Sequence, residues 1–250
     1  MTTPELPGPG AIIDYTLREA SATPITLDIL SASGEVMRTI RSVAGGANTG
    51  GGLPVAAASG MSEPPLPGQG RGGRGGRGGG ASAAPLTARA GMQRYVWDMA
   101  ADNGLTVPPG RYTVRLTAGA FTQTQPLEVR LDPRLTADGV TTEDLELQYR
   151  FNVRLRAAIA DAQQFTSSVQ KALASATPES KAALTRIQKA LVNETDIAYP
   201  QPMLNAQLQA ITRVSNVADV RPNNDAIRRL DDLEKELAAL KAEAAKVGLK

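Results

Sequence analysis

Hydrophobic residues recur with a period of two along the first half of the chain and with a period near 3.6 along the second half. Ile25, Leu27 and Ile29, for example, alternate with polar residues, and this alternation predicts a β-strand. Similar short runs, bounded by turn residues, occupy residues 10–17, 25–30, 36–40, 94–99, 111–116 and 121–131. Six or seven short strands with this spacing predict an antiparallel β-sandwich, and Pro126 predicts an edge position or a bulge in the last strand.

The second half carries four amphipathic helical stripes. Thr141 or Thr142 suits the N-cap of the first helix, and Thr177 followed by Pro178 opens the second. The apolar positions of the stripes step by three or four residues: Leu147, Phe151, Leu155, Ile159, Ala162, Phe165, Val169 and Leu173; Leu184, Ile187 and Leu191; Leu204, Leu208, Ile211 and Val214; Ile227, Leu230, Leu233, Leu237, Leu240, Ala244 and Val247. Helices of this kind with short connections pack as an antiparallel four-helix bundle, although the stripes also fit coiled-coil seams for another chain.

The two periods predict a multidomain chain of β plus α type, with a β-domain at residues 1–134 and a helical domain at residues 135–250. Within the β-domain, the composition changes abruptly from about residue 41 to about residue 89, where Gly, Ala, Pro and Ser dominate. Such a segment buries too little apolar surface to offset the entropy that ordering would cost. We expect a disordered Gly/Arg/Pro-rich loop inserted between two strands.

Two residue types that carry much of enzyme chemistry are absent. The 250 residues contain no cysteine, which excludes disulfides, zinc–thiolate sites, iron–sulfur clusters and thiol catalysis. They contain no histidine, which excludes Ser-His-Asp chemistry, histidine metal sites and the usual general base near neutral pH. Catalysis by two carboxylates stays chemically open, but no spacing of acidic residues indicates such a cleft. We expect no catalytic residue, no cofactor and no metal.

The net charge and the hydropathy of the chain limit the kinds of partner that we expect. The formal net charge is only +2, so we expect no extended surface for a polyanion. No stretch approaches the roughly 18 apolar residues of a membrane span. Residues 1–10 lack the basic flank and the apolar run of a signal peptide, so an export signal would belong to a longer precursor.

Two sets of motifs resemble known families. One set resembles the Ig-like domain of the flagellar hook-cap protein type, and its residues are the hairpin 25–40, Ala90-Gly91, Trp97-Asp98 and Pro109-Gly110-Arg111-Tyr112. The other set is similar to the C-terminal region of bacterial sortilin-like proteins with BNR repeats, commonly labelled glycosyl hydrolases. Its residues are 10–15 (GAIIDY), Tyr199-Pro200, Leu204-Asn205, Gln207-Leu208, Ala218-Asp219 and Arg221-Pro222.

The resemblance implies an Ig-like β-sandwich, a β-propeller domain or subunit as partner, and a periplasmic or extracellular location within a longer exported protein. It covers almost the whole chain apart from the insert, but only the tail of the family's architecture. The propeller, where a sugar-processing site would be expected, has no counterpart in this chain. The Ser-x-Asp-x-Gly-x-x-Trp box of sialidases does not occur either. The hydrolase activity is therefore carried over to no residue here.

One segment has a specific binding interpretation. Arg71, Arg74 and Arg77 lie in Arg-Gly-Gly repeats, and such tracts bind RNA through phosphate attraction and guanidinium stacking on unpaired bases. This tract has no interleaved aromatic residue, and expansion of a GC-rich repeat explains it equally well. The three arginines are weak nucleic-acid candidates, and we do not expect nucleic acid to be the main partner.

The core candidates of the β-domain are Trp97, Tyr112, Val114 and Leu116. Trp97 alternates with Tyr95 in a strand motif, and the other three residues share one strand face, which indicates packing in the core. A surface Trp97 stacked on a sugar ring is the alternative interpretation.

These features favour a non-catalytic structural or interaction module that resembles the accessory part of a secreted BNR-repeat protein. The helical bundle offers a second place for a protein partner. A nucleic-acid-binding protein that acts through the Arg-Gly tract is the alternative hypothesis, and a subunit of a carbohydrate-processing hydrolase is the third.

Overall fold

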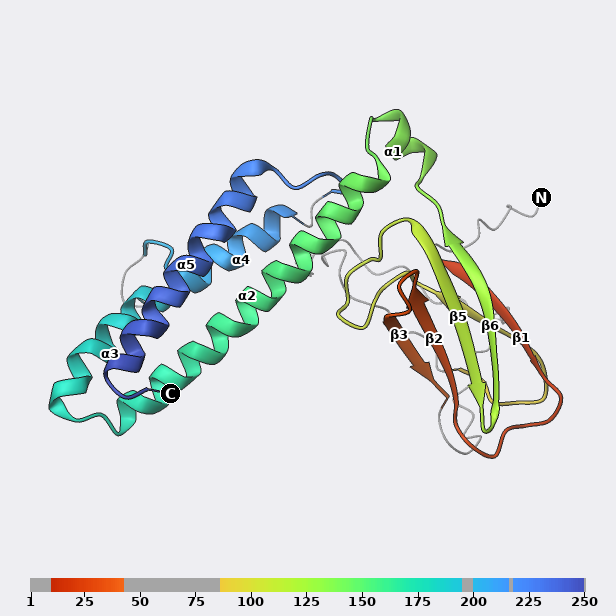
Figure 1. Cartoon of the computed structure of the whole chain (residues 1–250), viewed down its shortest axis with the longest axis horizontal. Helices are drawn as coiled ribbons and strands as arrows, with labels where there is room; N and C mark the ends of the chain where they lie inside the picture. The colour runs from red at the N-terminus through yellow and green to blue at the C-terminus, as the bar shows by residue number, and fades with distance from the viewer. Residues whose placement is uncertain (1–9, 43–85, 195–199, 216–217, 250) are drawn as a thin grey trace, which may run out of the picture. The chain divides into compact units, whose positions relative to one another are not determined.

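The computed structural model describes residues 10–42, 86–194, 200–215 and 218–249. Antiparallel sheets come first in the chain, and five helices follow (Figure 1). The described residues form two compact units, of which the first comprises residues 10–42, 86–106 and 111–129 and the second comprises residues 107–110, 130–194, 200–215 and 218–249. The change of hydrophobic period therefore falls close to the change from one unit to the other.

In the described part of the chain, six strands form two sheets, one with the order β3-β2-β5-β6 and one that pairs β1 with β4. The strands are β1 (Ala11–Leu17), β2 (Ile25–Ser31), β3 (Val36–Arg41), β4 (Gly91–Trp97), β5 (Gly110–Ala118) and β6 (Phe121–Val129). Every predicted strand is present, and β4 begins three residues before the predicted start at Arg94. β6 is an edge strand, so Pro126, which has no N–H, lies where Pro is tolerated in a sheet.

The core of the first unit consists of apolar side chains from both sheets. Ile25, Leu27 and Ile29 of β2 are almost completely buried and alternate along the strand, as a period of two requires. Trp97 of β4 is fully buried and meets Tyr112 of β5 edge to face, with the ring centroids 6.0 Å apart. This contact joins the two sheets.

The opposite face of β2 holds a partly buried ion pair. Asp28 is almost fully buried and accepts a hydrogen bond from the Thr39 hydroxyl of β3 at 2.9 Å. The guanidinium of Arg115 on β5 binds the other carboxylate oxygen, through Nη2 at 2.7 Å. Thr39 and Arg115 are also the cross-strand neighbours of Asp28, so this network fixes the register of three adjacent strands.

The predicted boundaries of the insert are wrong at both ends. Arg41 closes β3, and Ser42 exchanges hydrogen bonds with the backbone of Ile25. Leu86 is buried and pairs with Ser42 in a parallel bridge, and Thr87 binds the hydroxyl of Tyr15. Composition does not distinguish these few residues from the insert, because they adjoin the long Gly-rich stretch. Residues 43–85, including Arg71, Arg74 and Arg77, lie outside the described residues.

The helices are α1 (Pro133–Ala137), α2 (Thr142–Ala174), α3 (Pro178–Leu191), α4 (Leu204–Ser215) and α5 (Asn224–Lys246). Four helices were predicted, and the short α1 was missed. Asp132 caps α1 by accepting from the backbone N–H of Arg134, and Pro133 occupies its first turn. Thr141 caps α2 with a capping box to Asp144, and Thr177 caps α3.

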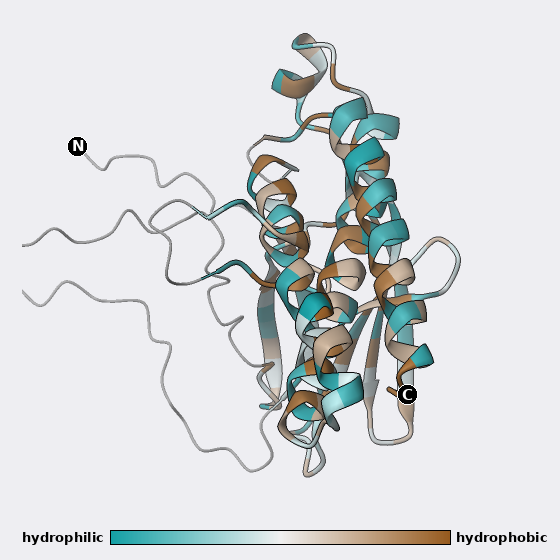
Figure 2. Cartoon of the chain, turned by 90° about the vertical axis from the view of Figure 1, so that its left-hand side faces the viewer, coloured by the Kyte–Doolittle hydropathy of each residue, from teal (hydrophilic) through white to brown (hydrophobic). Residues whose placement is uncertain are grey.

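One hydrophobic core holds the second unit together. α2, α3, α4 and α5 each contribute buried side chains to it, among them Leu155, Ile187, Leu208 and Leu233. Figure 2 shows these helices with a hydrophilic and a hydrophobic side, and α1 contributes no buried residue. Most apolar residues of the four stripes are therefore buried within the chain, and the coiled-coil alternative is not needed to bury them. Val214 is an exception, because it is 62% exposed at the end of α4.

The two cores predict separate responses to core truncation. Trp97→Ala should destabilise the first unit by about 3 to 5 kcal/mol because the residue is fully buried and joins the two sheets. Leu233→Ala should destabilise the helical unit by about 2 to 5 kcal/mol. Hydrogen exchange resolved by segment measures both, and each variant serves as the other's control. Equal loss of protection in both units from Trp97→Ala would contradict separate cores.

Candidate interaction surfaces

The outer face of the two-stranded sheet is the first candidate site. Along β1, Ile12, Asp14 and Thr16 are exposed, while the residues between them turn to the core. Their cross-strand partners on β4 are exposed too, and the six side chains form three facing pairs: Ile12 with Val96, Asp14 with Arg94, and Thr16 with Met92. We call these six residues the β1–β4 outer face.

Three of the six side chains are large, apolar and open to solvent. Ile12 is 50% exposed, Val96 is 45% exposed and Met92 is 77% exposed. Ile12 and Val96 lie directly opposite each other, so they form one continuous apolar contact area on the sheet. Burying such an area against another protein would release water from both partners.

An ion pair lies at the centre of this face. The guanidinium of Arg94 donates to both carboxylate oxygens of Asp14, through Nε at 2.8 Å and Nη2 at 3.0 Å. Because these hydrogen bonds and the positive charge favour the carboxylate, the pKa of Asp14 is lowered from its ordinary value, and the pKa of Arg94 is raised in turn. The pair keeps a fixed charge pattern between the apolar ends of the face.

Gly10 fixes the start of this sheet. Its φ is +147°, and a Cβ at this position would lie 2.6 Å from the carbonyl oxygen of Trp97 and 2.8 Å from the side chain of Val96. Any other residue would push the start of β1 away from the end of β4. The Gly10 backbone is therefore part of what aligns Ile12 with Val96.

The buried face of the same sheet carries two tyrosines with opposite hydrogen-bonding states. The hydroxyl of Tyr15 donates to the carbonyl oxygen of Thr87 at 2.8 Å and accepts from the backbone N–H of Thr87 at 3.0 Å. The hydroxyl of Tyr95 is buried with no hydrogen-bond partner among the described residues. Burial raises the pKa of both phenols, and for Tyr95 the nearby charge of Arg38 partly offsets this effect.

The predicted core residues lie in the interior of the first unit. Trp97 is fully buried, Tyr112 and Val114 are buried, and Leu116 is partly buried opposite Leu27. The indole N–H of Trp97 donates to the carbonyl oxygen of Ala100 at 3.0 Å, so its polar atom is satisfied as well. A buried ring leaves no open surface for a sugar, and the alternative of a sugar-stacking Trp97 is wrong.

Asp98 follows Trp97 and serves the loop after β4. Its carboxylate accepts from the backbone N–H of Ala100 at 3.1 Å, which stabilises a turn in which Met99 has a φ of +59°. Among the described residues, no group of three or more His, Cys, Asp or Glu side chains converges as a metal site would require. No helix in the described part of the chain is long and apolar enough to cross a membrane.

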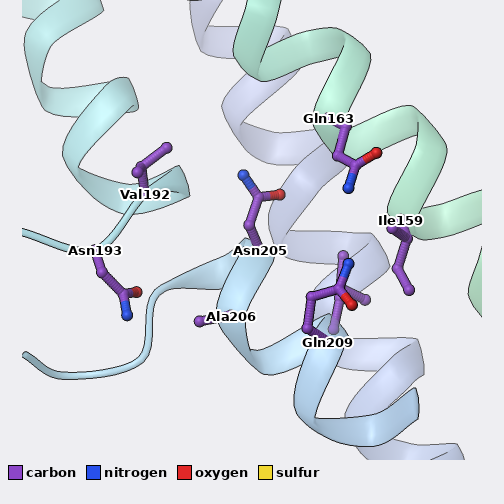
Figure 3. A pocket seen from close by; sticks show the side chains of 8 residues that line it. Ile159, Gln163, Val192, Asn193, Asn205, Ala206 and Gln209 are labelled. Atoms are coloured by element: carbon purple, nitrogen blue, oxygen red, sulfur yellow. The ribbon is translucent and has the colours of Figure 1, made fainter. Parts of the chain in front are cut away.

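A hollow in the helical unit is the second candidate site. It has a volume of about 290 Å³ and lies between α2, α4 and the residues that follow α3 (Figure 3). Its lining consists of aliphatic side chains and carboxamides, with no charged and no aromatic residue: Ile159, Gln163, Val192, Asn193, Asn205, Ala206, Leu208 and Gln209.

Sequence reasoning missed both surfaces. The two apolar residues Ile12 and Ile13 adjoin in β1, and Tyr95, Val96 and Trp97 adjoin in β4, so each strand has an apolar side chain on the face opposite the core. That departure from alternation was the available signal for the first surface. The hollow had no such signal, because its residues come from three separate segments.

The two tyrosines predict different effects of losing a hydroxyl. Tyr15→Phe should cost about 1 to 3 kcal/mol of unfolding free energy because Thr87 loses a partly buried partner for both backbone groups. Tyr95→Phe should cost little or should stabilise, since it removes a buried hydroxyl that has no partner among the described residues. Urea unfolding at neutral pH measures both, and equal losses would contradict this assignment.

The same tyrosines predict a loss of stability at alkaline pH. Because their pKa values are raised in the folded chain, the unfolded chain ionises first as the pH rises past the ordinary value of 10. Ionisation therefore leaves the stability unchanged below about pH 10 and lowers it as the pH rises further. Unfolding of the first unit followed between pH 8 and 12 should show this fall, and Tyr95→Phe should make it smaller. A fall of equal size in Tyr95→Phe would contradict the role of Tyr95.

In comparisons with protein-family models, with curated proteins and with solved structures, nothing matches this chain. The arguments for its function therefore rest on the arrangement of its own side chains and on the resemblance of its motifs.

Proposed function

We propose that this chain is a non-catalytic interaction module in which an Ig-like β-sandwich docks another protein domain and is followed by an antiparallel four-helix bundle. Support for the sandwich comes from two antiparallel sheets joined through Trp97 and Tyr112, with strands that alternate between core and solvent. Support for the bundle comes from the single core that α2, α3, α4 and α5 share.

The observation that carries the docking function is the exposed apolar content of the β1–β4 outer face. Single exposed apolar residues are normal on protein surfaces, but Ile12 and Val96 are direct cross-strand partners, and Met92 lies on the same face. A flexible methionine adapts to the shape of a partner. The ion pair of Asp14 with Arg94 would orient the partner by its charge pattern.

The partner that we propose is a β-propeller domain of the BNR-repeat type, in the same exported assembly. This part of the proposal rests on the motif resemblance at residues 10–15 and 199–222. The same resemblance favours a periplasmic or extracellular location. Any sugar chemistry of such an assembly would belong to the propeller, because this chain lacks histidine and cysteine and no spacing of its acidic residues indicates a paired-carboxylate cleft.

Binding of the chain to a purified BNR-type β-propeller from the same organism tests the proposal. The double variant Ile12→Lys and Val96→Lys should weaken binding by about tenfold or more, because it places two charges where apolar contact is needed. Its melting temperature should change little, since both side chains are about half exposed. Titration calorimetry measures the affinity.

Val36→Lys provides the matched control. Val36 is an exposed β-strand valine of β3, in the other sheet, and its substitution should leave the affinity unchanged. Absence of binding by the unmodified chain, or an equal loss in Val36→Lys, would overturn the proposed docking face.

A further inference from the structure

The carboxamide-lined hollow between α2 and α4 has the features of a binding site of its own. We infer that it binds the main chain of a short, uncharged peptide segment with small apolar side chains. This inference is independent of the β1–β4 outer face, because every residue of the hollow belongs to the helical unit.

The orientation of Asn205 is fixed by a chain of hydrogen bonds. The hydroxyl of Thr166 donates its one hydrogen to the carbonyl oxygen of Ala162 at 2.8 Å. Toward any other group this hydroxyl can therefore act only as an acceptor. The amide nitrogen of Asn205 donates to that hydroxyl at 2.9 Å. Its Oδ1 accepts no hydrogen bond from the described residues, and because the amide is held in this orientation it remains an acceptor of fixed position.

The orientation of Asn193 is fixed in the opposite sense. Its Oδ1 accepts from the backbone N–H of Met203 at 2.8 Å, and a backbone nitrogen can only donate. The amide nitrogen of Asn193 therefore keeps its two donor hydrogens without a partner in the described ranges of the chain. The hollow thus offers one fixed acceptor, on Asn205, and one fixed donor, on Asn193.

Two further carboxamides are free to adapt. Gln163 from α2 and Gln209 from α4 line the same hollow, and their side chains have no partner in the described parts of the chain (Figure 3). Each carries an acceptor and two donors on a flexible stem. They can follow a ligand that the two asparagines position.

The lining selects among ligand classes. A peptide group presents one N–H donor and one C=O acceptor, which complements a fixed acceptor and a fixed donor. The floor of Ile159, Val192 and Leu208 suits small apolar side chains of such a peptide. A phosphate or carboxylate would find no cation among the lining residues, and a sugar ring would find no aromatic face. The volume of about 290 Å³ lies just below the range of drug-sized sites and suits a short segment.

Nuclear magnetic resonance of the full 15N-labelled chain tests this inference. The probe is N-acetyl-dialanine N-methylamide, which has capped ends and carries no charge. Its addition should shift the side-chain amide signals of Asn193, Asn205, Gln163 and Gln209 in a saturable manner. Zwitterionic dialanine should bind more weakly, because its charged ends would meet no counter-charge in the lining.

Substitutions separate a specific site from general surface effects. Gln209→Ala should weaken probe binding by about three- to tenfold, the effect of one lost hydrogen bond, without changing the melting temperature. Gln164→Ala is the matched control, because Gln164 is the exposed neighbour of Gln163 on α2 and does not line the hollow. Thr166→Val should also weaken binding, because Asn205 loses the acceptor that holds its amide.

Three results would overturn the inference. The first is the absence of any saturable shift of the four amide signals on addition of the capped peptide. The second is a saturable shift of the same signals by N-acetylglucosamine that equals or exceeds the shift by the peptide, which would assign the hollow to a sugar. The third is a loss of affinity in Gln164→Ala as large as that in Gln209→Ala.

Discussion

The antiparallel pairing of β1 with β4 is the interaction on which the first unit depends. It joins segments about 80 residues apart, so its backbone hydrogen bonds close a long loop of that unit. The pairing places Trp97 against Tyr112 of the other sheet and so creates the contact between the sheets. Without it, the four-stranded sheet would expose the inner faces of β2 and β5 to water.

The same pairing generates the proposed docking surface. Two strands that face the core on one side must present their other side to solvent, and here that side holds Ile12, Val96 and Met92. A purely structural strand pair would carry polar residues at these positions. Exposure of these apolar side chains to water costs free energy, and that cost falls when another surface covers them. This is the physical reason to propose a partner there.

The helical unit is organised around its longest helix. Its long helix α2 contacts α3, α4 and α5 and supplies buried side chains along its length. The core is closed by Leu and Ile side chains, whereas the hollow forms where α3 has ended and α4 begins, with the small Ala206 and the carboxamides of Asn193 and Asn205 in the lining. Hydrogen bonds of Asn193 and Asn205 hold the polar side of the hollow, and its apolar side packs against the core.

The sequence by itself determined the order of strands and helices, the absence of histidine and cysteine chemistry and the burial of Trp97, and it limited the last strand to an edge position or a bulge. Periodicity and residue type are local properties, and they report which face of an element turns to a core. The sequence did not reveal α1, because one turn with no buried residue leaves no apolar stripe, although Asp132-Pro133 is a usable cap signal.

Only the tertiary structure decided which residues meet. The residues at the ends of the insert belong to the fold because Leu86 pairs with Ser42 and Thr87 binds Tyr15. Amino-acid composition does not show which residues form such pairs. The facing of Ile12 with Val96, and the donor and acceptor that Asn193 and Asn205 present, depend on hydrogen bonds between distant segments. Register and long-range contact are set by the simultaneous packing of all elements, so no local pattern of residues encodes them.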